Sequence, residues 1–109
     1  MDTRAVNLRH EPYDVYCGRP RKGHEWGFGN PFVVGRDQGR GKCVAMFERW
    51  LDTGDPQGSP DATEERRQWM QDNLHTLIGK RLGCFCMPNP CHASVLADRA
   101  MQLAQANER

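Results

Sequence analysis

The segment 80–92 constrains the fold of this chain more than any other feature. Its first part, 80–86, is short and rich in apolar residues, as expected of a strand, and Pro88 ends it. Asn89 then suits a helix N-cap and Pro90 a first helical residue, so a helix is expected to follow at once. A rigid turn therefore joins the two elements and predicts that the strand end and the helix start lie close together.

The remaining patterns predict a small α/β fold. Helices are expected at 39–53 and from Ser59 to about residue 78, because apolar residues recur there at helical spacing and Gly54 and Gly79 follow them. Short strands are expected at 5–8, 13–17 and 32–34. A chain of 109 residues makes a single α/β domain, 1–109, so this order predicts a short mixed sheet covered by about three helices.

Charge and cysteine content limit the class of protein. The net charge is +1, but residues 1–42 carry eight Lys and Arg against five Asp and Glu, an excess that suits phosphate or simply a solvated surface. No apolar run reaches the length of a membrane span, and residues 1–4 do not open an apolar signal segment. Five clustered cysteines point to reduced thiols in the cytoplasm rather than to disulfides.

Four potential metal ligands fall within nine residues: Cys84, Cys86, Cys91 and His92. Cys84 and Cys86 share one face of the expected strand, while Cys91 and His92 fall in the first helical turn, where the helix dipole favours an anionic sulfur. The simplest prediction is Zn²⁺ held by all four groups. His92 is the doubtful ligand, because neighbouring helical residues diverge by about 100°. Cys17 or His24 would then replace it.

Two other interpretations of the cysteines stay open. In the first, Cys91 is a catalytic thiolate assisted by His92, and Cys84 or Cys86 is a resolving thiol. In the second, the cysteines are small core residues of a protein-interaction module. Cys43 lies on the apolar stripe of the first helix and is expected in the core.

A basic, glycine-rich loop follows the second expected strand. Its candidate ligand-binding residues are Arg19, Arg21, His24, Trp26 and Asn30. Arginine pairs with phosphate, and rings such as those of Trp26 and Phe28 can stack on a base. The loop therefore predicts binding of a nucleotide or nucleic acid, although it matches no known phosphate-binding fingerprint. The plainer alternative is an ordinary loop that its aromatic residues anchor to the core.

The ordered motifs of this chain resemble a known family. They are Tyr16-x-Gly18-Arg19-Pro20, then Gly29-Asn30-Pro31-Phe32, then Leu82-x-Cys84-x-Cys86-x-Pro88-x-x-Cys91-His92 with Val95-Leu96. The chain resembles domain-of-unknown-function family 4326, of bacteria and their phages, over residues 4–100. The resemblance places the following residues in the family's motif set and supplies no activity: Arg19, Asn30, Cys84, Cys86, Cys91 and His92.

Two departures from this family pattern bear on function. Cys17 stands where an aliphatic residue is expected, which makes it worth testing as a fourth ligand. Ala93 and Ser94 stand where Gly and an acid are expected, which weakens a catalytic interpretation. We therefore expect a small cytoplasmic zinc-binding protein that binds or acts on a nucleotide or nucleic acid. A closed ligand shell would favour a binding module, and an open position would favour an enzyme.

Overall fold

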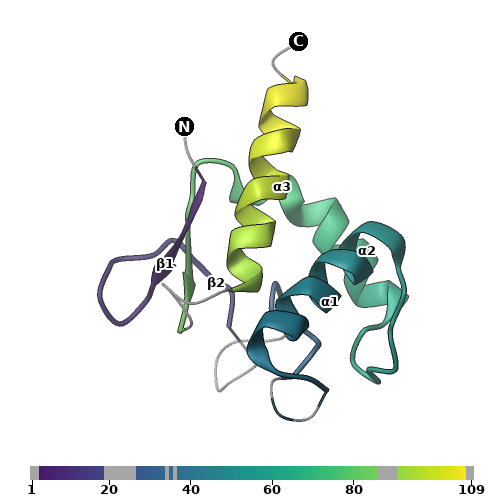
Figure 1. The fold of residues 1–109 in the computed structure, drawn as a ribbon. Helices are drawn as coiled ribbons and strands as arrows, with labels where there is room; N and C mark the ends of the chain where they lie inside the picture. Colours follow the sequence, from purple (N-terminus) through teal and green to yellow (C-terminus); the bar gives the residue numbers. More distant parts are fainter. Residues whose placement is uncertain (1–2, 19–26, 34, 36, 86–90, 108–109) are drawn as a thin grey trace.

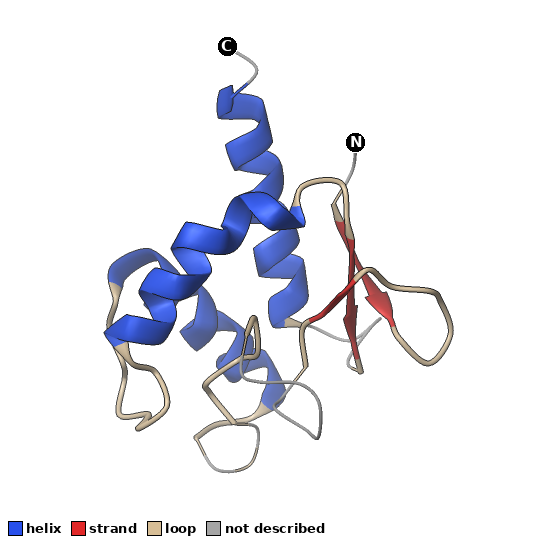
Figure 2. Cartoon of the chain, turned by 180° about the vertical axis from the view of Figure 1, so that it is seen from behind, coloured by secondary structure: helices blue, strands red, loops and turns tan. Residues whose placement is uncertain are grey.

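The computed structural model describes residues 3–18, 27–33, 35, 37–85 and 91–107, which form three strands and three α-helices (Figure 1). In chain order the elements are β1 (Arg4–Asn7), β2 (Val15–Tyr16), α1 (Arg40–Thr53), α2 (Glu64–Asn73), the 3-10 turn η1 (Leu74–Leu77), β3 (Arg81–Cys84) and α3 (His92–Asn107). The helices lie on one side of the strands (Figure 1, Figure 2). The predicted α/β class is confirmed.

The sheet has the order β1-β3-β2. Within the described residues both pairings are parallel, with Arg4 beside Arg81 and Val15 beside Leu82, whereas the sequence had suggested a mixed sheet. The difference arises in the connection 8–14, which carries the chain back toward the start of β3 before β2 begins. Asp14 fixes that return, because its carboxylate accepts a hydrogen bond from the backbone N–H of Arg81 at 2.8 Å.

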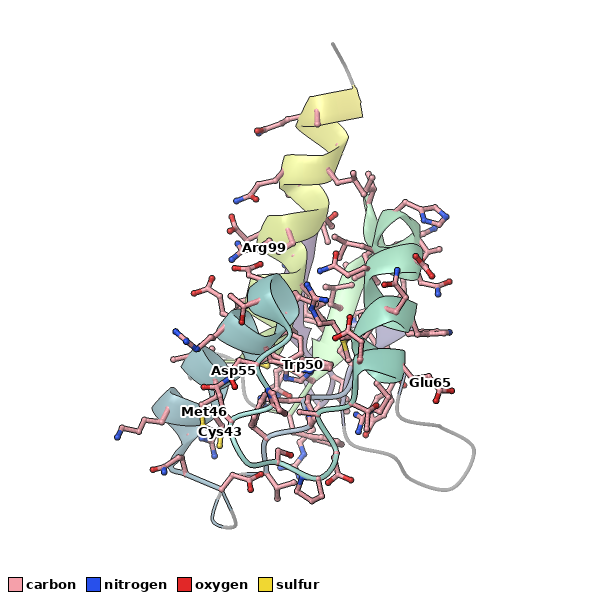
Figure 3. The ribbon with its side chains drawn as sticks, turned by 90° about the vertical axis from the view of Figure 1, so that its right-hand side faces the viewer. Cys43, Met46, Trp50, Asp55, Glu65 and Arg99 are labelled. Carbon is pink, nitrogen blue, oxygen red and sulfur yellow. The ribbon has the colours of Figure 1, made fainter. Side chains whose placement is uncertain are left out.

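Helix α1 forms where its apolar stripe predicted it. The stripe buries Cys43, Phe47, Trp50 and Leu51, and Trp50 lies in the interior between the helices and the sheet (Figure 3). Gly54 ends the helix in a left-handed conformation with φ of 84°. The expected core position of Cys43 is confirmed, since that residue is 1% exposed.

The prediction that the second helix begins near Ser59 is wrong. Helix α2 begins at Glu64, and the N-cap is Thr63, whose side chain accepts a hydrogen bond from the Arg66 N–H. The hydroxyl of Ser59 instead donates to the Pro31 carbonyl at 3.0 Å. Because this long-range hydrogen bond joins the two loops, Ser59 does not cap a helix, and the Ser59-Pro60 pattern does not mark a helix start.

A strand was also expected at 32–34. Of these residues the structure describes 32 and 33, and neither of the two lies in a strand. The Phe32 N–H donates to Asn30 Oδ1 at 2.9 Å, and the Val33 N–H donates to Asp37 Oδ2 at 2.8 Å. Because nearby side chains satisfy both donors, neither pairs with a neighbouring strand.

The two faces of the sheet have different surroundings. On the inner face, Leu82 and Cys84 join the core cluster together with residues of all three helices. On the opposite face, the Tyr13 ring lies over Gly83, where an added Cβ would come within 2.6 Å of Tyr13 Cγ. In the described part of the chain, helices cover the inner face of the sheet and not the opposite face (Figure 2).

Candidate functional site

Cys84 reaches the site from the end of the central strand. It pairs in register with Asn7 of β1. Alternation along β3 turns its side chain, like that of Leu82, toward the helices, and the residue is 1% exposed. Phe85, the next residue, is 41% exposed, as the predicted alternation requires.

Cys91 reaches the site from the helix side. It lies one residue before α3, rather than in the first turn where the sequence had placed it. Its carbonyl accepts from the Ser94 N–H at 3.0 Å, and its Sγ accepts from the Ala93 N–H at 3.4 Å. Cys91 therefore has the contacts of a helix N-cap, and its sulfur faces the positive end of the helix dipole.

The two sulfurs lie 2.9 Å apart, Cys91 Sγ to Cys84 Sγ, and both residues are buried. A disulfide would bring them to about 2.05 Å. Shared ligation of tetrahedral Zn²⁺, with Zn–S bonds of about 2.3 Å, would hold them about 3.8 Å apart. The observed separation lies between these values, so either state requires a relative shift of slightly less than about 1 Å.

His92 is buried beside this thiol pair. Its Nε2 lies 3.0 Å from the Phe28 carbonyl oxygen, and its ring packs edge-on against Phe47. Burial lowers the pKa of His92 to about 4, although the carbonyls of Cys17 and Phe28 oppose the shift. The ring is therefore neutral at pH 7, with the hydrogen on Nε2 and the lone pair on Nδ1. That Nδ1 lies 3.8 Å from Cys91 Sγ.

Cys17 comes close to the same site from β2. Its N–H donates to the Gly83 carbonyl at 2.8 Å, which places the residue beside Cys84 on the inner face. Burial raises the pKa of Cys17 to about 12, and nearby Cys84 adds to the shift. At neutral pH Cys17 is therefore a thiol that becomes a ligand only when a metal displaces its proton.

Most of the predicted loop residues lie outside the described part of the chain. These are Arg19, Arg21, His24 and Trp26, together with Cys86 of the cysteine motif. Asn30 is described, and both ends of its amide make contacts within the protein. Its Nδ2 donates to the Cys43 carbonyl at 3.2 Å, and its Oδ1 accepts from the Phe32 N–H. These contacts give Asn30 a role in shaping the loop, and its role in ligand binding stays a prediction.

Phe28 has a role that the sequence did not indicate. Its ring is 5% exposed and packs against Trp69 with the centroids 5.0 Å apart, so it is not available to stack on a base. Its carbonyl instead fixes the tautomer of His92. No sequence signal could have identified this partner, because the group is a backbone atom 64 positions away.

Comparison with known proteins places the chain in a family. A family model described as a domain of unknown function (DUF4326) matches residues 2–102. The chain belongs to this family. The match covers every described element up to the last turns of α3 and includes the whole cysteine motif. No curated protein matches this family member, and no solved structure does.

Two features of the described residues bear on the class of this family member. Within the ranges that the structure describes, no three or more His, Cys, Asp and Glu side chains converge as a metal site would require. None of the described helices combines the length and apolarity needed to cross a membrane. The described residues thus provide a thiol pair and a histidine, but not a complete ligand shell.

Proposed function

We propose that this DUF4326 protein binds a metal ion, most simply Zn²⁺, through the Cys84 and Cys91 thiolates. The observation that carries the proposal is the 2.9 Å separation of the two sulfurs at the N-terminus of α3. Two buried sulfurs at this distance repel each other once both are deprotonated, and a shared cation removes that repulsion. The positive end of the helix supports the anionic form of Cys91.

The candidates for the remaining ligands lie both outside and within the described part of the chain. Because no three described ligands converge, at least one ligand comes from outside the described residues, and Cys86 and His24 are the candidates. Within the described part, Cys17 lies beside Cys84 in the sheet and the Nδ1 of His92 lies 3.8 Å from Cys91 Sγ, so these two groups are further candidates. A bound Zn²⁺ would fix these groups and stabilise the join between β3 and α3.

Elemental analysis of the purified protein tests this proposal. We expect about one zinc per chain, lost in Cys84→Ser and in Cys91→Ser. Cys43→Ser is the matched control, because Cys43 of α1 is equally buried but its Sγ donates to the Gln38 carbonyl at 3.3 Å. A metal-free protein whose unfolding midpoint does not change on addition of zinc would overturn the proposal.

The partner of this metal protein is proposed to be a nucleotide or nucleic acid. The support comes from the sequence of the basic loop, whose described neighbours in the chain are Gly18 on one side and Gly27 and Phe28 on the other. Binding of a nucleotide or an oligonucleotide is expected to weaken in Arg19→Ala and with added salt. A dissociation constant that neither change alters would remove this part of the proposal.

A second candidate function is a thiol-dependent enzyme that acts on a nucleotide or nucleobase. The observation that favours it is the Cys91–His92 contact, in which Nδ1 lies 3.8 Å from the Cys91 sulfur at the positive end of α3. In chelator-treated protein Cys91 should then react with iodoacetamide faster than Cys43, and His92→Gln should slow it. Equal rates at Cys91 and Cys43 would leave the cysteines as structural residues of an interaction module.

We also propose a cytoplasmic location. Among the described residues, no disulfide joins the cysteines at 17, 43, 84 and 91. Thiols that ligate a metal or act as nucleophiles must stay reduced, as they do in that compartment.

A further inference from the structure

The face of the sheet opposite the helices is unusual for a parallel sheet. Parallel sheets are usually covered on both faces, because their crossover connections place helices there. Here the described helices lie on one side only, and the connection 8–14 lies on the other (Figure 1, Figure 2). Val6 is 1% exposed yet does not belong to the core cluster that the helices make with the inner face.

Aromatic and basic side chains occupy this outer sheet face, which we define by Arg4, Val6, Arg9, Tyr13, Arg81, Gly83 and Phe85. Alternation along β3 puts Arg81, Gly83 and Phe85 on the same side. Tyr13 lies over Gly83 and is 36% exposed, and Phe85 is 41% exposed. These two rings account for two of the three large exposed hydrophobic residues in the described part of the chain.

Positive charge surrounds the rings. The Arg9 guanidinium carbon lies 5.0 Å from the centroid of the Phe85 ring, and no described carboxylate pairs with Arg9. Arg4 and Arg81 are neighbours in register, and their acidic partners are Glu11 at 3.4 Å and Asp14 at 3.1 Å. Arg4, Arg9 and Arg81 thus give the face three cations against these two carboxylates, so it is positive overall.

We propose that the outer sheet face binds single-stranded nucleic acid, with bases stacked on Phe85 and Tyr13 and phosphates held by Arg9 and its basic neighbours. Exposed rings on a sheet stack bases without sequence preference, and an arginine plane beside them adds cation–π and phosphate contacts. An acidic peptide would satisfy the charges but would leave both rings exposed. The inference extends the nucleic-acid part of the proposed function and is independent of the metal.

Fluorescence anisotropy of a short labelled oligothymidylate tests this surface. Phe85→Leu keeps an apolar side chain but removes the ring, and we expect it to weaken binding about tenfold. Phe85→Tyr should restore most of the affinity. Arg9→Gln should weaken binding and lower the dependence of log Kd on log salt by about one phosphate contact. Arg49→Gln is the control, because Arg49 is an exposed arginine of α1 on the helical side.

Several results would overturn the inference. If Phe85→Leu and Arg9→Gln bind like the unsubstituted protein while Arg19→Ala does not, the nucleic acid binds elsewhere and the proposed function survives. If no variant and no salt concentration gives binding, both the inference and the nucleic-acid part of the proposed function fail. Equal competition by polyglutamate would mean that the face binds polyanions through charge alone. Concentration-dependent dimerisation that Phe85→Leu abolishes would mean that the face binds a second copy of the chain.

Discussion

Lowering the pH from 7 to 5 should destabilise the protein through His92. The pKa of this buried ring is about 4 in the folded state, against an ordinary value of 6.5. Between these two values the unfolded chain binds a proton that the folded chain does not. The stability that depends on neutral His92 is therefore complete above about pH 6.5 and is lost as the pH falls through that window toward 4.

The size of this effect follows from the two pKa values. At about 1.4 kcal/mol per pH unit, the whole window corresponds to about 3 kcal/mol, of which about 2 kcal/mol is lost between pH 7 and pH 5. For a domain of this size such a loss lowers Tm by about 10 °C. Asp14 does not contribute in this range, because Arg81 lowers the pKa of its carboxyl from 3.8 to about 2, so its window lies below pH 4.

Urea titration followed by tryptophan fluorescence measures this loss, with a chelator present at both pH values so that metal binding does not contribute. In His92→Gln the side-chain amide can still donate toward the Phe28 carbonyl, and the difference between pH 7 and pH 5 should largely disappear. His75→Gln is the control, because His75 is exposed on η1. Equal free energies of unfolding at the two pH values in the unsubstituted protein would refute the reasoning.

Three substitutions test the packing around the sheet and loops through the urea midpoint. Gly83→Ala should destabilise the fold, because its Cβ would meet Tyr13 Cγ at 2.6 Å and Tyr13 Cβ at 2.9 Å, and Tyr13→Gly, which removes both atoms, should recover part of the loss in the same chain. Thr63→Ala removes the N-cap of α2 and should cost about 1 kcal/mol, whereas an unchanged midpoint would contradict that role. Ser59→Ala removes the hydroxyl donor to the buried Pro31 and should cost about 1–3 kcal/mol, and Ser59→Thr should cost less if the hydrogen bond is the cause.

Local patterns predicted those elements whose stabilising contacts are local. The apolar stripe of α1 and the glycine after it are short-range signals, and both held. The start of α2 failed, because the hydroxyl of Ser59 bonds to Pro31, far away in the chain. The strand at 32–34 failed for a related reason, since side chains from 30 and 37 took the backbone donors of its first two residues. Strand direction could not be read at all, because alternation is the same in parallel and antiparallel strands.

The candidate site likewise has one part that the sequence predicted and one part that it did not. The proline-bounded turn predicted that Cys84 and Cys91 would meet, and the structure brings their sulfurs within 2.9 Å. The burial and neutrality of His92 depend on Phe28 and Phe47, which come from other parts of the fold. Sequence spacing alone could not reveal that environment.

The position of β3 between the two N-terminal strands has a consequence for synthesis on the ribosome. Arg4 of β1 pairs with Arg81 of β3, and the hydroxyl of Thr3 donates to the Leu77 carbonyl at 3.0 Å. Strands β1 and β2 therefore have no partner strand until β3 has been synthesised. Helices α1 and α2 can form as soon as they emerge, but the sheet cannot form until residue 84 has left the exit tunnel. Closing such distant contacts is slow, and the unpaired edges of the N-terminal strands are exposed to other chains until β3 arrives.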